Sequence, residues 1–196
     1  MIKTHLMVMD ELKAYASPKA RLTRMLKSGE LIQVRRGLFV DDPSISPRAL
    51  APILYGPSYI SFQYVLASHG LIPERVTVIT SASFNKNKDK VFHTPFCEYR
   101  YLYLPSAVYP YGIHQEEEND SSYLIASPEK ALCDAVYKIP GVTSQDEMDR
   151  LLLEDWRMEQ GELIKLDRDF ISWIAPLYRR KSLTALAGWF QRKVSR

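Results

Sequence analysis

The stretch that most constrains the fold is residues 17–40, which read SPKARLTRMLKSGELIQVRRGLFV. Ser17 can accept hydrogen bonds from the free amides of a following helix, and Pro18 suits the first helical position because its missing N–H would be unpaired there. Gly29 supplies the stop, since glycine readily takes the left-handed conformation that ends many helices. Two short strand-like runs then flank a turn at Gly37. This stretch therefore predicts a helix followed by a β-hairpin.

The exposed positions of this stretch are dominated by basic residues. Helical spacing turns Leu22, Met25 and Leu26 toward a core and leaves the opposite face polar. Between positions 13 and 36 there are seven basic residues and one acid. Such charges can simply keep an amphipathic helix solvated, but a helix followed by a basic-tipped hairpin is also the pattern of a recognition helix and wing. The candidate DNA-binding residues are Lys19, Arg21, Thr23, Arg24, Lys27, Arg35 and Arg36.

Charge is distributed unevenly along the 196 residues, whose net charge is +3. Residues 1–48 hold nine basic and five acidic residues, 49–178 hold eleven and eighteen, and 179–196 hold six and none. Any nucleic-acid surface must therefore be built from the two ends, because the acidic middle repels a polyanion. Basic residues near the C-terminus form a candidate second patch, or they complement the dipole of a last helix. They are Arg179, Arg180, Lys181, Arg192 and Lys193.

The chain divides near residue 48 into two predicted domains. A first helix at residues 4–15 can pack on the helix described above, so that residues 1–48 form a short winged-helix-like unit. A full winged helix usually has three helices before the wing, and the chain leaves no room for the middle one. Prolines make residues 42–52 a poor helix or strand, and we interpret that segment as a linker. Residues 49–196 form the second domain.

Periodicity gives this second domain a mixed α+β character. Residues 58–69 are apolar on most sides, which predicts a buried helix. Residues 76–104 alternate β-branched and aromatic positions with polar ones and predict an antiparallel sheet of three or more strands. Further helices are predicted at residues 128–138, 145–154, 169–179 and 182–194. The fold class is therefore α+β, with a winged-helix-like unit first, then an antiparallel sheet and C-terminal helices.

Two features of the second domain admit two interpretations each. Tyr99, Tyr101 and Tyr103 share one face of a strand, where they could stack on single-stranded nucleic acid or pack beneath a helix. The negative charge of the segment favours packing. The acidic run at residues 116–120 is most simply a solvated loop, and the alternative is a docking point for a basic partner.

No catalytic, metal-binding or cofactor-binding motif is recognisable. The sequence has no phosphate-binding glycine loop, nucleophile elbow or His-Glu-x-x-His pattern. Two cysteines, Cys97 and Cys133, cannot form a zinc site by themselves. Asp89 and Glu98 come nearest to a metal-dependent nuclease, but the adjacent Arg100 cannot serve as a base because arginine keeps its proton. We expect a protein that is not an enzyme and uses no metal or cofactor.

The N-terminal residues carry charges where a signal peptide needs an apolar core, and no apolar run approaches the length of a membrane span. These two observations predict a cytoplasmic protein without a membrane partner.

Three segments resemble the AbiEi family of antitoxins and transcriptional regulators from bacterial type IV toxin–antitoxin systems. They are residues 17–40, residues 55–83 (YGPSYISFQYVLASHGLIPERVTVITSAS) and residues 123–138 (YLIASPEKALCDAVYK). The resemblance implies a winged-helix domain that binds operator DNA, and an antitoxin domain that counters a nucleotidyltransferase-like toxin. It would place the recognition helix at residues 18–28 and the wing at 31–40.

The leading hypothesis is therefore an antitoxin that represses its own operon. A homodimer is compatible with it, because one small helical reader rarely gives useful affinity alone. The alternatives are a protein-interaction module that neutralises a toxin without binding DNA and, less favoured, a metal-dependent nuclease.

Overall fold

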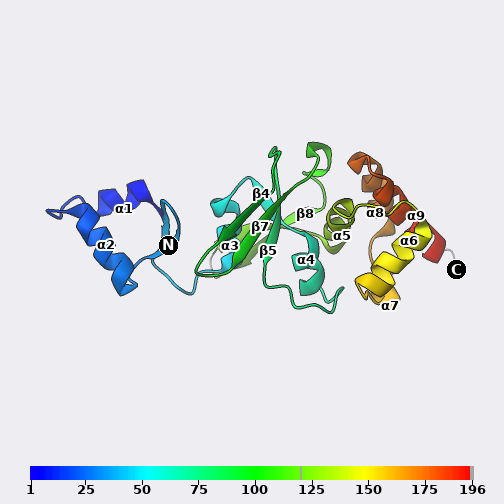
Figure 1. The fold of residues 1–196 in the computed structure, drawn as a ribbon, viewed down its shortest axis with the longest axis horizontal. Coiled ribbons are helices and arrows are strands. Elements are labelled where there is room, and N and C mark those ends of the chain that lie inside the picture. Colours follow the sequence, from blue (N-terminus) through cyan, green and yellow to red (C-terminus); the bar gives the residue numbers. More distant parts are fainter. Residues whose placement is uncertain (120, 195–196) are drawn as a thin grey trace.

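The structure is a computed structural model that describes residues 1–119 and 121–194. Figure 1 shows three parts in a row: a small N-terminal unit, a β-sheet with helices on both faces, and a group of C-terminal helices. The predicted α+β class is confirmed. None of the helices in the described part of the chain combines the length and apolar character that a membrane span requires.

The N-terminal unit is built from two helices and a three-stranded sheet. Its strands are all antiparallel and lie in the order β1-β3-β2. Helix α2 has the predicted bounds and ends at Gly29, whose φ is 78°, but the Ser17 side chain makes no capping hydrogen bond. The first helix, predicted at residues 4–15, is shorter, because β1 includes residue 4 and the helix already ends at Glu11. The elements are β1 (Ile2–Thr4), α1 (His5–Glu11), α2 (Pro18–Ser28), β2 (Ile32–Arg35) and β3 (Leu38–Val40).

The β3 strand divides its side chains between two cores. Phe39 joins Val8, Leu12, Leu22 and Leu31 in a small core beneath α1 and α2. The neighbouring residues on β3 point to the opposite face, as strand geometry requires, and belong to the main core. These residues are Leu38 and Val40. The N-terminal unit therefore relies on the rest of the chain for one face of its sheet.

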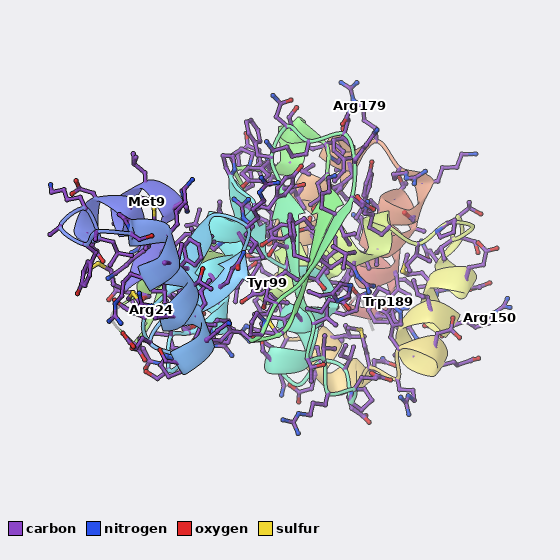
Figure 2. All side chains as sticks on the ribbon, turned by 60° about the vertical axis from the view of Figure 1, so that its left-hand side comes forward. Met9, Arg24, Tyr99, Arg150, Arg179 and Trp189 are labelled. Atoms are coloured by element: carbon purple, nitrogen blue, oxygen red, sulfur yellow. The ribbon has the colours of Figure 1, made fainter. Side chains whose placement is uncertain are left out.

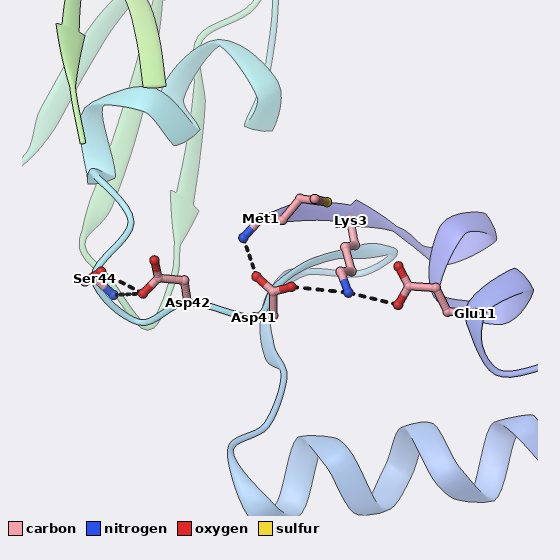
Figure 3. Close-up of polar contacts among 6 residues, drawn as sticks. All are labelled: Met1, Lys3, Glu11, Asp41, Asp42 and Ser44. Carbon is pink, nitrogen blue, oxygen red and sulfur yellow. Dashed lines mark hydrogen bonds and ion pairs between the residues drawn. The ribbon is translucent and has the colours of Figure 1, made fainter. Parts of the chain in front are cut away.

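Polar contacts fix the end of β3 and the short connection that follows it (Figure 3). Lys3 Nζ lies 2.8 Å from Glu11 Oε2 and 3.2 Å from Asp41 Oδ2, so it links β1, α1 and the end of the hairpin. Asp42 Oδ1 accepts hydrogen bonds from the backbone N–H and hydroxyl of Ser44, at 2.8 and 2.7 Å. The connection is therefore a structured turn.

The linker predicted at residues 42–52 is wrong over most of its length. Helix α3 (Pro47–Leu54) occupies it, and the predicted domain boundary at residue 48 falls inside this helix. Ser46 accepts from the Arg48 N–H at 3.2 Å, and Pro47 takes the first helical position, where a proline favours a helix. The prolines thus begin this helix, and its buried face packs in the main core.

The second sheet has six strands in the order β6-β7-β5-β4-β9-β8. Its hairpins β6-β7 and β8-β9 and the pair β4-β5 are antiparallel. The prediction of an antiparallel sheet is wrong for β5 and β7, which are parallel, as are β4 and β9. Alternation predicts that a segment is a strand but not which strand it pairs with. The strands are β4 (Ser58–Ile60), β5 (Ile79–Ser83), β6 (Lys90–His93), β7 (Glu98–Tyr103), β8 (Ile113–Glu118) and β9 (Ser121–Ala126).

The structure also corrects the secondary structure predicted for two segments, residues 58–69 and 116–120. The helix predicted at residues 58–69 is a strand, β4, followed by α4 (Phe62–Ser68), because a short buried strand and a buried helix have the same apolar pattern. The acidic run 116–120 is a loop only at its end. Its three glutamates belong to the edge strand β8, while Asp120 lies outside the described residues.

Helix α3 covers one face of this sheet, and α4 and α5 (Pro128–Tyr137) lie on the other (Figure 1). Tyr99 and Tyr101 are completely buried under α3, and their hydroxyls donate to the carbonyls of Pro47 and Ala51 at 2.8 and 2.6 Å. Tyr103, at the end of β7, is exposed. The packing interpretation of the tyrosines is confirmed for the first two.

The C-terminal helices pack around α9, which contacts α5, α6 and α8. The helix predicted at 145–154 continues as a π-helical turn, and the one predicted at 169–179 becomes a 3-10 turn where Pro176 follows its last α-helical residues. The elements are a 3-10 turn at Ser106–Val108, α6 (Gln145–Arg150), the π-helical turn Leu151–Asp155, α7 (Gln160–Leu163), α8 (Arg168–Ile174), the 3-10 turn Ala175–Tyr178 and α9 (Lys181–Val194).

A buried polar network joins the sheet to α5 and the C-terminal helices. Lys130 and Asp134 are fully buried on α5, with 2.5 Å between Nζ and Oδ1. Tyr59 and Ser61, at the sheet, donate to Asp134 Oδ2 at 3.0 and 2.7 Å. Tyr178 donates to Asp134 Oδ1 and accepts from Lys130 Nζ at 2.8 Å. Burial and the nearby carboxylate raise the pKa of both tyrosines, so their hydroxyls remain donors.

This network generates a stability prediction. Asp134→Asn should lower the free energy of unfolding by about 3–5 kcal/mol, because it leaves the Lys130 ammonium buried without its counter-charge. Urea unfolding of the full chain measures the loss, with Asp169→Asn, at an exposed position, as the control. A loss below about 1 kcal/mol would contradict a paired, charged Lys130.

Candidate nucleic-acid interface

The outer face of α2 points away from the core that the helix helps to form. Leu22 is buried, whereas Lys19, Thr23, Arg24 and Lys27 are exposed. Figure 2 shows Arg24 on α2, at the opposite end of the molecule from Arg150 and Trp189. The predicted orientation of the helix is confirmed by these exposures.

The cations of α2 differ in their partners. Within residues 1–119 and 121–194, Lys19, Arg24 and Lys27 form no ion pair with a carboxylate. Arg21, by contrast, has its Nη2 2.9 Å from Glu30 Oε2, and its guanidinium lies over the Tyr15 ring at 5.7 Å. Arg21 thus shares its charge with Glu30, the one acid of this stretch, and its role as a DNA-binding residue stays a prediction.

Glu30 also holds the end of the helix. Its Oε1 accepts from the Ser28 hydroxyl at 2.9 Å while its Oε2 binds Arg21. In the middle of the helix, the Thr23 hydroxyl donates to the Lys19 carbonyl at 3.0 Å, which leaves only its lone pairs for a ligand. The outward face thus offers three free cations and one acceptor.

The two arginines at the hairpin tip lie on different sides. Arg36 lines a hollow of about 590 Å³ together with Leu22 and Leu26 of α2, so it lies beside the candidate recognition helix. Arg35 lies near Tyr101 of the six-stranded sheet. Burial raises the pKa of Tyr101, and the positive charge of Arg35 partly opposes this rise. Both arginines are exposed, and Arg36 shares the hollow with two residues of α2.

The candidate second basic patch divides into two groups. Arg192 Nη1 lies 3.0 Å from Asp146 Oδ1, and Lys193 Nζ lies 3.0 Å from Asp149 Oδ1. A hydrogen bond from the Trp189 indole and the nearby Lys193 lower the pKa of Asp149. These two cations therefore fasten α9 to α6.

The other group, Arg179, Arg180 and Lys181, precedes or begins α9, and the helix separates Lys181 from Arg192 by roughly 16 Å at its usual rise. Figure 2 places Arg179 far from Arg24, and Figure 1 agrees, with α2 and the start of α9 in different parts of the molecule. The basic ends of the sequence do not form one continuous surface.

The carboxylates considered for a nuclease are also separated. The register of β6 and β7 pairs His93 with Glu98, so Asp89 lies about four residues away along the hairpin, roughly 14 Å. Asp89 accepts from the Tyr103 N–H at 2.8 Å, and Glu98 pairs with Arg100 at 2.8 Å. These two carboxylates cannot share a metal ion.

No group of three His, Cys, Asp or Glu side chains in the described residues is arranged to hold a metal. Burial raises the pKa of both Cys97 and Cys133, which makes them poor nucleophiles at neutral pH.

The acidic residues of β8 contact neighbouring elements. Glu116 accepts from the Tyr123 hydroxyl at 3.0 Å and from His114 at 3.2 Å, and Glu118 accepts from the Ser46 hydroxyl in the connection. Glu117 is exposed. A solvated loop is therefore not the right description of these glutamates.

Sequence reasoning missed the network around Lys130 and Asp134. The available signal was a lysine and an aspartate four residues apart within an otherwise apolar helical face, a spacing that allows an ion pair. It also missed the Arg21–Glu30 pair, because a nine-residue separation across a helix end carries no periodic signal.

Comparison with models of known protein families and with curated proteins finds no match for this sequence. The fold and the site define an α+β protein with a basic helix and hairpin at one end.

Proposed function

We propose that this protein is a cytoplasmic antitoxin and autoregulatory repressor of a type IV toxin–antitoxin operon, which binds operator DNA through α2. The observation that carries the DNA-binding part is the exposed face of α2, where Lys19, Arg24 and Lys27 have no carboxylate partner among the described residues. Unpaired cations on one helical face release counterions when they meet phosphates.

The order of elements in the N-terminal unit supports a winged-helix interpretation. Two helices, α1 and α2, are joined by six residues and followed directly by the β2-β3 hairpin. In such units the second helix lies in the major groove, and the first crosses the backbone. On this interpretation β1 precedes the helix pair, so the element that the unit lacks is the helix before the pair and not a middle one.

Each cation then has a role. Arg24 and Lys27 lie toward the middle and end of α2, where they would meet base edges or the groove walls. Lys19, in the first turn of α2, and Arg36, which lines the hollow, would contact the phosphate backbone. The amides at the start of α2 can bind a further phosphate, since the Ser17 side chain does not cap them. A homodimer would place two copies of α2 on successive half-sites.

The antitoxin part of the proposal rests on the AbiEi resemblance. The second and third resembling segments meet in space, because Tyr59 and Ser61 from residues 55–83 bind Asp134 from residues 123–138. One unit built from both segments supports a common role for them. Its proposed partner is a nucleotidyltransferase-like toxin.

A second candidate is a protein-interaction module that neutralises a toxin without DNA. Two observations favour this candidate: Arg21 is paired with Glu30, and Arg35 lies near Tyr101 of the six-stranded sheet. Both reduce the positive charge that the N-terminal unit can offer to DNA. In that case the full chain rescues growth when the neighbouring toxin gene is expressed, yet no duplex retains it in a salt-dependent manner.

The DNA-binding proposal is tested by Arg24→Gln combined with Lys27→Gln. We expect binding to the duplex upstream of the protein's own gene to weaken about tenfold or more, and the slope of log K against log salt to fall by about two, since two phosphate contacts are lost. Fluorescence anisotropy at several salt concentrations measures both quantities.

The matched control is Arg75→Gln combined with Arg150→Gln, two exposed cations outside the N-terminal unit. The control should bind like the original protein. Equal affinities for the α2 variant and the control would remove α2 as the DNA-binding element.

A further test uses the acid that neutralises Arg21. Glu30→Gln should strengthen duplex binding and steepen the salt slope by about one, because Arg21 becomes available to a phosphate. The same anisotropy titration measures the change. Weaker binding by this variant would mean that Glu30 supports DNA binding by holding α2 in position, and does not weaken it by repelling phosphates.

A further inference from the structure

Three consecutive cations, Arg179, Arg180 and Lys181, lie where the 3-10 turn meets α9. All three side chains are exposed, and none forms an ion pair with a carboxylate among residues 1–119 and 121–194. Figure 2 shows Arg179 well away from Arg24, so this cluster is separate from the proposed DNA-binding face. Three adjacent like charges without a counter-charge repel one another, and an anion would relieve that repulsion.

The cluster lines a hollow of about 310 Å³ whose opposite wall is the segment 139–143, between α5 and α6. That wall contributes the apolar side chains of Ile139, Pro140 and Val142. A space of this volume, with cations on one side and apolar groups on the other, matches the lower end of small-molecule sites.

Two carboxylates on neighbouring elements are engaged elsewhere. Glu147 Oε2 accepts from the N–H groups and hydroxyls of Thr143 and Ser144, and these bonds lower its pKa to about 2. Asp89 binds the Tyr103 N–H and Lys138. Neither of them neutralises the three cations.

The cations are also held in place. The Arg180 guanidinium lies 5.1 Å from the centroid of the Tyr137 ring, a cation–π contact. Arg179 adopts a left-handed φ of 52°, and its N–H donates to the Pro176 carbonyl at 3.1 Å. The hydroxyl of the buried Ser182 donates to the Val136 carbonyl at 3.3 Å. The positive end of the fourteen-residue helix α9 adds to the potential at this point.

We propose that this hollow binds the phosphate groups of a small phosphorylated ligand. Arginine forks bind phosphate oxygens in pairs, and Lys181 adds a point charge. The ligand's remaining part would lie against Ile139, Pro140 and Val142. Inorganic pyrophosphate and a nucleoside diphosphate share this phosphate chemistry and differ only in whether that apolar wall is used.

The test is isothermal titration of the full chain with pyrophosphate and with ADP at low salt. We expect saturable binding that Arg179→Gln, Arg180→Gln and Lys181→Gln together weaken about tenfold or more. If the triple variant does not fold, Lys181→Gln alone is the test. It keeps the contact between Arg180 and Tyr137 and should weaken binding about threefold.

Two controls separate this site from the rest of the surface. Arg75→Gln with Arg150→Gln, and Arg24→Gln with Lys27→Gln, should both leave the affinity for pyrophosphate unchanged. Loss of binding only in the α2 variant would overturn the proposal, as would a titration in which the original protein binds neither ligand, or one in which the cluster variants bind like the original.

The two ligands identify the source of the phosphate. Equal affinities would indicate an inorganic ligand, since the apolar wall then contributes nothing. Tighter binding of ADP, reduced toward that of pyrophosphate by Val142→Ser, would indicate a nucleotide. Both results support a phosphate site at the start of α9, and neither depends on whether α2 binds DNA.

Discussion

The buried pair of Lys130 and Asp134 is the interaction on which the arrangement of the body depends. Removing two charges from water costs several kcal/mol for each, and a protein recovers this only when every remaining hydrogen-bonding atom finds a partner. Here the partners of the α5 pair come from β4, from the N-cap residue of α4 and from the turn before α9, through Tyr59, Ser61 and Tyr178. A shift of any of these elements would leave a charge or hydroxyl unpaired. The network therefore selects one position for α5 between the sheet and the C-terminal helices.

The N-terminal unit also depends on contacts with the rest of the chain. Its own core contains five buried apolar side chains, too few for a stable isolated fold of this length. The β3 strand compensates by alternating, with Phe39 beneath α1 and α2 and with Leu38 and Val40 in the main core. The hairpin thus contributes side chains to both cores. The position of α2 therefore depends on contacts between its unit and the rest of the chain.

Tertiary contacts decide which of the many cations remain available. The sequence concentrates positive charge at its two ends, but tertiary and local contacts place five of those cations beside carboxylates among the described residues: Lys3, Lys13, Arg21, Arg192 and Lys193. Among the exposed cations of the described residues that have no carboxylate partner, one group lies on the outer face of α2, near the hairpin tip, and another at the start of α9. The two groups lie in different parts of the molecule, so a ligand proposed for one of them does not contact the other (Figure 2).

The sequence by itself determined the features that neighbouring residues control. Serine followed by proline marks the start of α5, glycine ends α2, and the negative charge around the alternating tyrosines of β7 favoured packing, as observed for Tyr99 and Tyr101. Only the tertiary structure decided that residues 47–54 form a helix of the main core, that β4 is a strand, and that β5 and β7 run parallel. The reason is physical: caps and turns are satisfied by residues a few positions away, whereas a strand pair such as Ile60 with Ile125 depends on segments that meet only after the chain has folded.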